Sequence, residues 1–275
     1  MANSEVHPAS QQHSLSSMLL SGGDPRVRHW PLMGSPAVIV SILAGYLYFS
    51  LRLGPALMKN RRPFPIRPLV VAYNGVMVLL SVYFFVLTLS LTYLRDPAST
   101  QQLLKPYSLF CQGTDPTVDA NPLLYHGWFY MLMKVGELLD TVFFVLLKKN
   151  GHISFLHLLH HSLALSTVWM DINNGITGQV AMFPILNTAV HMVMYTYYGL
   201  SALSPERRPN LWWKKYVTQL QIAQFFALMV HGGIPLFYDC GFPRVMACFM
   251  VLETALFTGL FSDFYYRNYL LRKAD

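Results

Sequence analysis

Residues 157–165 read HLLHHSLAL and place three histidines inside a segment that is otherwise apolar enough to lie in a membrane. On a helix, His157, His160 and His161 stand at positions i, i+3 and i+4, so their imidazoles share one face. Polar rings at membrane depth are costly unless they face a cavity, a metal or a substrate. We therefore predict a functional site here; a histidine patch at the lipid headgroups is the alternative.

The composition of the whole chain indicates a membrane protein. Of its 275 residues, 53% are hydrophobic and 12% are charged, and the mean hydropathy is +0.36. A soluble domain carries about 25% charged residues. Apolar stretches near the length of about 20 residues that a span needs occur at 36–58, 68–94, 124–147, 155–171, 177–200, 213–233 and 243–266. We predict an all-α integral membrane protein with seven transmembrane helices.

The distribution of basic residues predicts the orientation. They follow the first, third, fifth and seventh spans: Lys59, Arg61, Arg62, Arg67, Lys148, Lys149, Arg207, Arg208, Lys214, Lys215, Arg267, Arg272 and Lys273. Under the positive-inside rule the C-terminus is cytosolic and the N-terminus lumenal. Residues 1–30, rich in Ser, Gln and His, are predicted to be disordered or loosely ordered, before a single domain at 31–275. Because the bases serve topology or an anionic ligand, the net charge of +7 predicts no nucleic-acid partner.

A second polar group lies in the third span, within KVGELLDT. Lys134, Glu137 and Thr141 share one stripe of a helix, and Asp140 flanks it. A Lys–Glu pair at this spacing is often only an internal salt bridge. Two acids and a base in one span favour an ordered site.

A third group lies in the fifth span, within NTAVHMVMYTYY. Asn187, His191, Met194 and Tyr198 form one stripe, and Tyr195 stands beside it. A lone histidine is usually a satisfied core residue, and tyrosines near a span end usually form an interfacial belt. Because Asn187 and His191 lie one turn apart at membrane depth, we favour a functional site over these two alternatives.

The predicted topology brings these groups to the cytosolic half of the membrane. Spans three and five run inward and span four begins there, while Gln219 and Gln221 enter the sixth span from the same side. The glutamines could instead bond neighbouring helices. A polar chamber with apolar helix beyond it suits an acyl chain attached to a charged carrier.

Together HLLHH, KVGELLDT, NTAVHMVMYTYYGL and TQLQIAQF resemble the motifs of the eukaryotic ELO family of very-long-chain fatty acid elongases, from about residue 54 through the last span. The stretch through YYGLSAL and LWWKKY looks most like animal members that elongate saturated and monounsaturated chains. The resemblance implies six helices around a tunnel closed at the lumenal side. It also implies a 3-oxoacyl-CoA synthase of the endoplasmic reticulum, with a metal-free site, no cofactor beyond acyl-CoA and malonyl-CoA, and membrane reductases and a dehydratase as partners. A homodimer is compatible with it.

The resemblance and the residues together suggest roles. The expected catalytic set is His157, His160, His161, His191, Lys134, Glu137, Asp140 and Asn187. Histidine can serve as nucleophile or as base, and the family favours an acyl-histidine, with His160 acylated and His191 close by. His157 and His161 would orient, shuttle protons or steady the malonyl carbonyl.

CoA carries phosphates, which pair with Arg and Lys. The expected substrate- and CoA-binding residues are Thr141, Tyr195, Tyr198, Gln219, Gln221, Arg62, Lys148, Lys149, Lys214, Lys215 and Arg267, with Arg61 a further candidate.

The cysteines and the C-terminus add two expectations. Topology puts Cys111 and Cys240 on the lumenal side, where a disulfide can form, although two free thiols remain the alternative; Cys248 should stay reduced. The final RKAD, with Arg272 and Lys273, resembles a dilysine retrieval signal or is an ordinary basic tail.

Two other classes stay open as rival functions. A metal-dependent desaturase needs several histidine boxes and this chain has one, with Lys134 poorly placed beside a cation. A seven-span receptor or transporter would not require three histidines on one face.

Overall fold

The computed structural model describes residues 22–94, 106–116, 121–203 and 212–271, and its elements there are helical. The helices are α2 (Pro36–Tyr48), η1 (Phe49–Leu53), α3 (Gly54–Met58), α4 (Arg67–Leu91), α5 (Asn121–Glu137), α6 (Leu139–Leu146), η4 (Asn150–His152), α7 (Phe155–Asn173), η5 (Gly178–Ala181), α8 (Met182–Ala202), α9 (Lys214–Phe237), α10 (Arg244–Tyr265) and η6 (Tyr266–Leu270). They occupy the seven ranges predicted from the apolar stretches.

Four of the helical stretches are long and apolar enough to cross a membrane: Pro36–Met58, Arg67–Leu91, Lys214–Phe237 and Arg244–Leu270. The other three predicted spans contain the polar motifs, and the third is divided into α5, of 17 residues, and α6, of 8. The candidate site therefore lies mainly in the helices that do not by themselves meet this length and apolarity.

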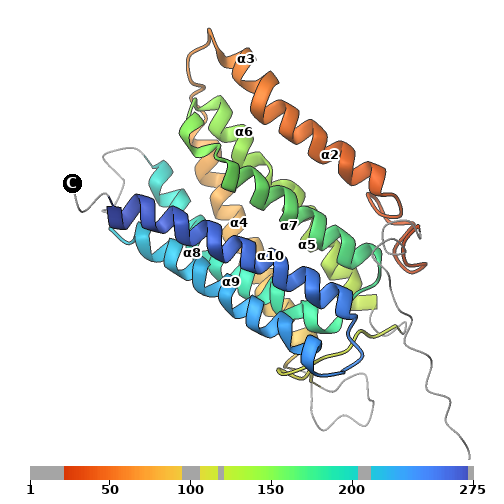
Figure 1. The fold of residues 1–275 in the computed structure, drawn as a ribbon. Helices are drawn as coiled ribbons and strands as arrows, with labels where there is room; N and C mark the ends of the chain where they lie inside the picture. The colour runs from red at the N-terminus through yellow and green to blue at the C-terminus, as the bar shows by residue number, and fades with distance from the viewer. Residues whose placement is uncertain (1–21, 95–105, 117–120, 204–211, 272–275) are drawn as a thin grey trace, which may run out of the picture.

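The helices pack as neighbouring pairs around those three central segments. Helix α4 packs on α8, α5 on α7, α9 on α10, and α8 on α9. Figure 1 shows α2 and α3 along one side of the bundle, where they contact α7 and α6 and lie away from α9 and α10. The first helix is thus largely peripheral, with only Ile39 and Tyr46 of α2 buried.

The division between α5 and α6 falls inside KVGELLDT. The N–H of Leu138 bonds to the carbonyl of Val135 at 3.2 Å, and that of Thr141 to the carbonyl of Leu138 at 3.2 Å. These three-residue steps tighten the helix, as 3₁₀ turns do, and such turns inside a helix often mark functional positions. The turn changes the direction in which the following side chains point.

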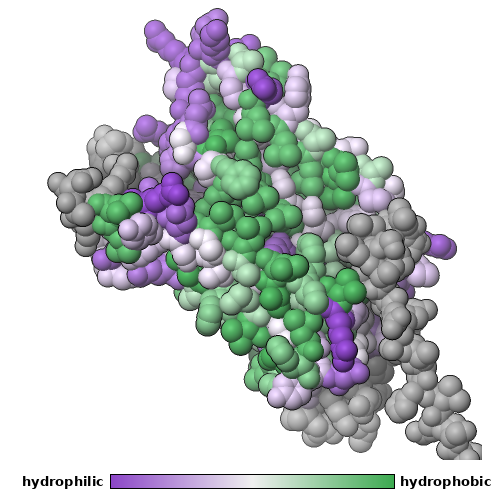
Figure 2. Space-filling view, viewed as in Figure 1, coloured by the Kyte–Doolittle hydropathy of each residue, from purple (hydrophilic) through white to green (hydrophobic). Residues whose placement is uncertain are grey.

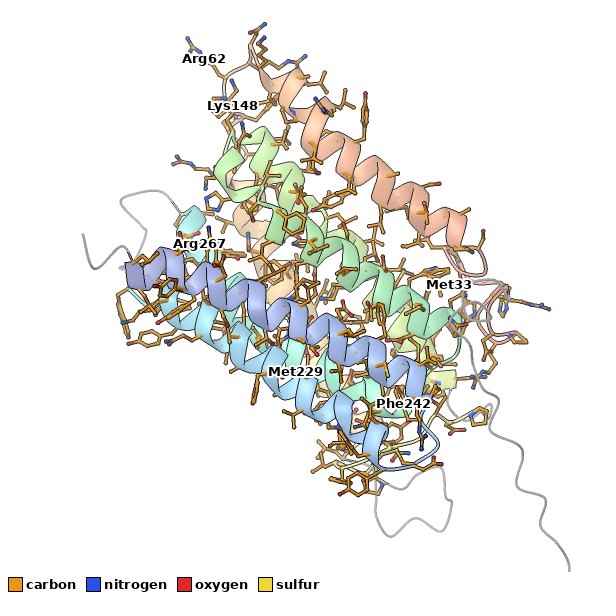
Figure 3. All side chains as sticks on the ribbon, in the orientation of Figure 1. Met33, Arg62, Lys148, Met229, Phe242 and Arg267 are labelled. Carbon is orange, nitrogen blue, oxygen red and sulfur yellow. A yellow bond between two sulfur atoms is a disulfide. The ribbon has the colours of Figure 1, made fainter. Side chains whose placement is uncertain are left out.

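Basic loops gather at one end of the bundle, which we name the basic end. Figure 3 places Arg62, Lys148 and Arg267 at this end and Met33 and Phe242 toward the other. Figure 2 shows mostly apolar side chains over the middle of the visible face and polar ones gathered toward its ends. This pattern matches the predicted grouping of the bases. The predicted retrieval signal, Arg272 and Lys273, lies outside the described residues.

The opposite end, which we name the disulfide end, is braced by a covalent bond. Cys111 and Cys240 form a disulfide across 129 positions of sequence, while Cys248 is free. Beside it, the fully buried amide of Gln179 donates to the carbonyl of His231 at 2.8 Å. In the chain-entropy model, a loop this long gains about 4–5 kcal/mol from its disulfide.

Residues 22–34 also pack at the disulfide end. Val27 is fully buried, the N–H of Asp24 bonds to the carbonyl of Asn173, and the N–H of Gly34 bonds to the Asn173 side chain at 2.8 Å. The end of α7 thus supplies hydrogen-bond partners for residues 22–34. Residues 1–21 of the segment predicted to be loosely ordered lie outside the described residues.

Candidate functional site

The three histidines of HLLHH lie in the first two turns of α7, near the basic end. Ser154 caps the helix, its hydroxyl accepting from the N–H of His157 at 3.2 Å. The ring centroids of His157 and His161 are 4.4 Å apart, and those of His160 and His161 are 5.5 Å apart. The predicted shared face is therefore one contiguous cluster of imidazoles.

His160 sits in an aromatic pocket formed by α9 and α10. Its ring meets Phe257 at 5.1 Å and Phe225 and Phe261 at 6.0 Å between centroids, each edge to face. No residue among those described hydrogen-bonds to its ring nitrogens. His160 thus has imidazole nitrogens that are not committed to another side chain, in apolar surroundings.

Lys134, Glu137 and Asn187 form a buried network between α5 and α8. Lys134 Nζ donates to Glu137 Oε1 at 2.8 Å and to Asn187 Oδ1 at 2.6 Å. Tyr130 donates to the same Asn187 oxygen at 2.7 Å. Lys134 and Glu137 are each at most 2% exposed, so their charges are compensated inside the bundle rather than by solvent.

This network orients His191. Because Asn187 Oδ1 already accepts two hydrogen bonds, its amide NH₂ must face His191 Nε2, which lies 3.2 Å away. Nε2 is then an acceptor, and the proton of the neutral ring resides on Nδ1, which lies 3.2 Å from Glu137 Oε1. The Asn187 amide therefore selects this tautomer of His191, and the Glu137 carboxylate lies beside Nδ1 without the geometry of a hydrogen bond.

Thr141 and Asp140 face different partners after the turn at the start of α6. Thr141 Oγ1 lies 2.8 Å from His157 Nε2, and Tyr195 donates to Asp140 Oδ2 at 3.1 Å. Tyr195 is fully buried, whereas Tyr198 is 37% exposed. The structure thus joins Tyr195 to the catalytic candidates and leaves Tyr198 at the margin.

An apolar chamber lies beyond this cluster, toward the disulfide end. Its cavity volume is about 60 Å³, and its lining comes from α4, α5, α7, η5, α8 and the loop before η5: Phe84, Thr88, Leu123, Leu124, His126, Gly127, Tyr130, Val168, Asp171, Ile172, Ile176, Thr177, Val180, Ala181, Phe183 and Pro184. Tyr130 lines the chamber and also bonds to Asn187. The polar cluster and the apolar space are therefore neighbours.

Comparison with known proteins agrees with this geometry. The model of the ELO (GNS1/SUR4) family matches residues 31–275. This chain belongs to the ELO family. The ELO-family chain is 39% identical over 255 residues to mouse very long chain fatty acid elongase 1, covering 91% of this chain and 88% of that protein. It is 38% identical to rat very long chain fatty acid elongase 7, covering 91% and 87%. It is also 38% identical to a very long chain fatty acid elongase of Aedes aegypti, covering 91% and 68%. The predicted family is confirmed.

The predicted CoA-binding bases of this ELO-family chain do not form one group. Lys148 Nζ donates to the Lys59 carbonyl at 3.2 Å, Arg267 pairs with Asp263, and Lys215 lies over the Tyr216 ring. Arg62 is exposed in the loop after α3. The glutamines also separate: Gln219 donates to the Tyr265 hydroxyl at 2.8 Å, and Gln221 to the sulfur of Met194 at 3.4 Å.

Lys149 and Lys214 are two bases whose charges reach the same side chain. Both act on His152, which lies in η4 outside the long helices. Burial, followed by the positive charges of Lys149 and Lys214, lowers the pKa of His152 below its usual value. Lys149 follows α6 and Lys214 begins α9, so the charges of two different segments make this spot at the basic end locally positive.

Sequence reasoning missed several polar residues of the site. Tyr130 is one turn before Lys134, a spacing that could have indicated it. Tyr46 meets Thr141 from α2, and Tyr73 meets the Gly136 carbonyl from α4. Neither sits near a motif, so no sequence signal marked them.

The donor set of the cluster can also be compared with metal sites. Among the residues that the structure describes, no group of three or more His, Cys, Asp or Glu side chains is arranged to hold a metal ion. The metal-free reading therefore remains a prediction for chemical analysis.

Proposed function

We propose that this ELO-family protein catalyses the condensing step of fatty acid elongation, joining acyl-CoA and malonyl-CoA into 3-oxoacyl-CoA. The relatives named as very long chain fatty acid elongases support the pathway. The observation that carries the proposal is that Tyr130 belongs both to the buried network around His191 and to the apolar chamber. An acyl chain in that chamber would have its thioester end at the histidines.

The first step is transfer of the acyl group to His160. An uncommitted nitrogen of His160 attacks the thioester carbon, and the C–S bond breaks as CoA thiolate leaves. His191 Nε2 takes the proton from the second nitrogen of His160 and passes it to the thiolate, while Glu137 on Nδ1 stabilises the imidazolium that forms. The amide hydrogen of Asn187 that does not face His191 supplies a hydrogen bond to the carbonyl oxygen.

The second step is condensation. Malonyl-CoA loses its carboxylate as carbon dioxide, and the resulting C2 carbanion attacks the acyl carbon. The C–N bond breaks, 3-oxoacyl-CoA departs, and His160 takes up a proton. The aromatic pocket of Phe225, Phe257 and Phe261 excludes water, which would otherwise hydrolyse the acyl-imidazole.

The test of this function is release of labelled carbon dioxide from carboxyl-labelled malonyl-CoA by purified protein, across acyl-CoAs of increasing chain length. Release that depends on acyl-CoA, with 3-oxoacyl-CoA as product, is expected. A folded protein that releases none with any chain length would refute the proposal.

The chamber should set the longest acyl chain accepted. A second, smaller cavity adjoins it, and Asp171, Val180 and Phe183 border both. Phe183→Ala is expected to join the two spaces and extend the longest efficient substrate by at least one elongation step. Ala181→Leu should fill the chamber and lower kcat/KM for the longest substrate about tenfold or more, sparing shorter ones.

The control for these variants is Leu252→Ala, because Leu252 is 69% exposed on α10 and borders neither space. Mass spectrometry of the products measures the chain-length profile of each variant. An unchanged chain-length profile in both chamber variants would place the acyl tail elsewhere.

The CoA phosphates should bind beside His152, the side chain on which the charges of Lys149 and Lys214 both act. Replacing both with serine is expected to raise the KM for acyl-CoA about tenfold while kcat changes little, because the contact is made equally in ground and transition states. Lys215→Ser is the matched control, since Lys215 lies over the Tyr216 ring at 4.8 Å. If Lys215→Ser raised the KM for acyl-CoA as much as the double variant does, this binding position would be rejected.

The cellular setting follows from the same proposal. With the basic end in the cytosol, CoA substrates would reach the histidines directly and the disulfide would lie in the oxidising lumen. We place the protein in the membrane of the endoplasmic reticulum, where reductases and a dehydratase would process its product.

A further inference from the structure

Tyr46 reaches the histidine cluster from a helix that otherwise faces outward. It is 7% exposed, whereas Tyr48 and Leu51 just after it are 61% and 56% exposed. Its hydroxyl lies 2.8 Å from Thr141 Oγ1, which in turn lies 2.8 Å from His157 Nε2. A chain of two hydrogen bonds therefore connects the peripheral α2 to a histidine of the site.

Counting the protons shows in which direction the hydrogen bonds between Tyr46, Thr141 and His157 run. If His157 donated from Nε2 to Thr141, and Thr141 to Tyr46, the phenol proton would have no acceptor among the described residues. A buried donor without a partner costs about 1–3 kcal/mol. In the opposite direction, Tyr46 donates to Thr141 and Thr141 donates to His157, so both hydroxyl protons are used. Nε2 is then an acceptor, and the proton of neutral His157 resides on Nδ1.

We infer that Tyr46 and Thr141 are positioning residues that hold His157 as its Nδ1–H tautomer, making it a hydrogen-bond donor to a substrate carbonyl rather than a base. The ring nitrogen away from Thr141 is the one left for substrate, because His157 is only half-buried. A neutral imidazole that donates a hydrogen bond stabilises a developing oxyanion. The nitrogen that faces the substrate therefore carries a proton and can donate it but cannot accept one, while the lone pair of Nε2 faces Thr141.

The kinetic part of this inference rests on the proposed function. Tyr46→Phe is expected to lower kcat about tenfold with an unchanged KM for acyl-CoA, since it frees Thr141 to turn. Thr141→Val, which removes the bond to His157, should lower kcat about a hundredfold. Thr141→Ser keeps a hydroxyl and should recover most of that loss. Tyr48→Phe removes an exposed hydroxyl from the same helix and serves as the control.

The tautomer can be measured without substrate. In protein with ¹⁵N-labelled histidine, the His157 signals, assigned by their loss in His157→Gln, should show a protonated Nδ1 and an unprotonated Nε2. Tyr46→Phe should shift this pattern toward a mixture of tautomers. A wild-type His157 protonated on Nε2, or an unchanged kcat in Tyr46→Phe, would overturn the inference even if Thr141→Val failed to fold. Absence of carbon dioxide release by the wild type would instead refute the proposed function, leaving the spectrum to judge the tautomer.

Discussion

Purified His160→Ala protein is expected to lose condensation by a factor on the order of a thousand or more, because no other group in its aromatic pocket can carry the acyl chain. His191→Ala should lose activity to a similar extent, since the proton transfer at His160 then has no acceptor held by Glu137. Labelled carbon dioxide release from malonyl-CoA measures both.

The covalent step gives a sharper readout than turnover. With acyl-CoA alone, the wild type should release free CoA and gain the mass of one acyl group, whereas His160→Ala should gain none. His29→Ala is the matched control, because His29 is an exposed histidine in the segment before α2. Full activity without an adduct would favour direct attack in a ternary complex. Normal turnover in His160→Ala, or stoichiometric iron or zinc in active protein, would reject the assignment.

The helical period was sufficient to group the three histidines, because positions i, i+3 and i+4 share a face wherever the helix lies. It could not supply their surroundings. Phe225, Phe257 and Phe261 read as ordinary apolar residues of two hydrophobic helices, and only the packing of α9 on α10 and their approach to α7 turn them toward His160. Side chains that face lipid and side chains that line a site look alike in such helices.

The same limit explains why the sequence did not predict the surroundings of the tyrosines. Tyr195 and Tyr198 were both expected among the substrate-binding residues. Tyr195 is buried against Asp140, whereas Tyr198 lies nearer the end of α8 at Ala202 and is partly exposed, although it shares the stripe of His191. Tyr46 had no periodic partner at all, because its contact with Thr141 depends on where the peripheral α2 docks. Local pattern predicts which residues share a helix face, and tertiary packing decides what that face meets.

Lys134→Met should destabilise the protein by about 3–5 kcal/mol, because it leaves the Glu137 carboxylate buried without its cation. Asn187 also loses one of the two donors that orient its amide. The double variant Lys134→Met with Glu137→Leu removes both charges and should recover most of the lost stability. Its condensation activity should stay near background, because His191 then lacks the carboxylate that lies beside Nδ1 and would stabilise its imidazolium.

Thermal unfolding in detergent measures the stability of each variant, and carbon dioxide release measures its activity. The matched control is Arg267→Met, which breaks an exposed Arg267–Asp263 pair one helical turn apart and should cost less than about 1 kcal/mol. If Lys134→Met cost no more than this control, the buried Glu137 carboxylate would not depend on Lys134 for its stability. If the double variant were both stable and active, Lys134 and Glu137 would be a structural salt bridge only. Recovery of stability without activity is what separates an arrangement kept for chemistry from one kept for packing.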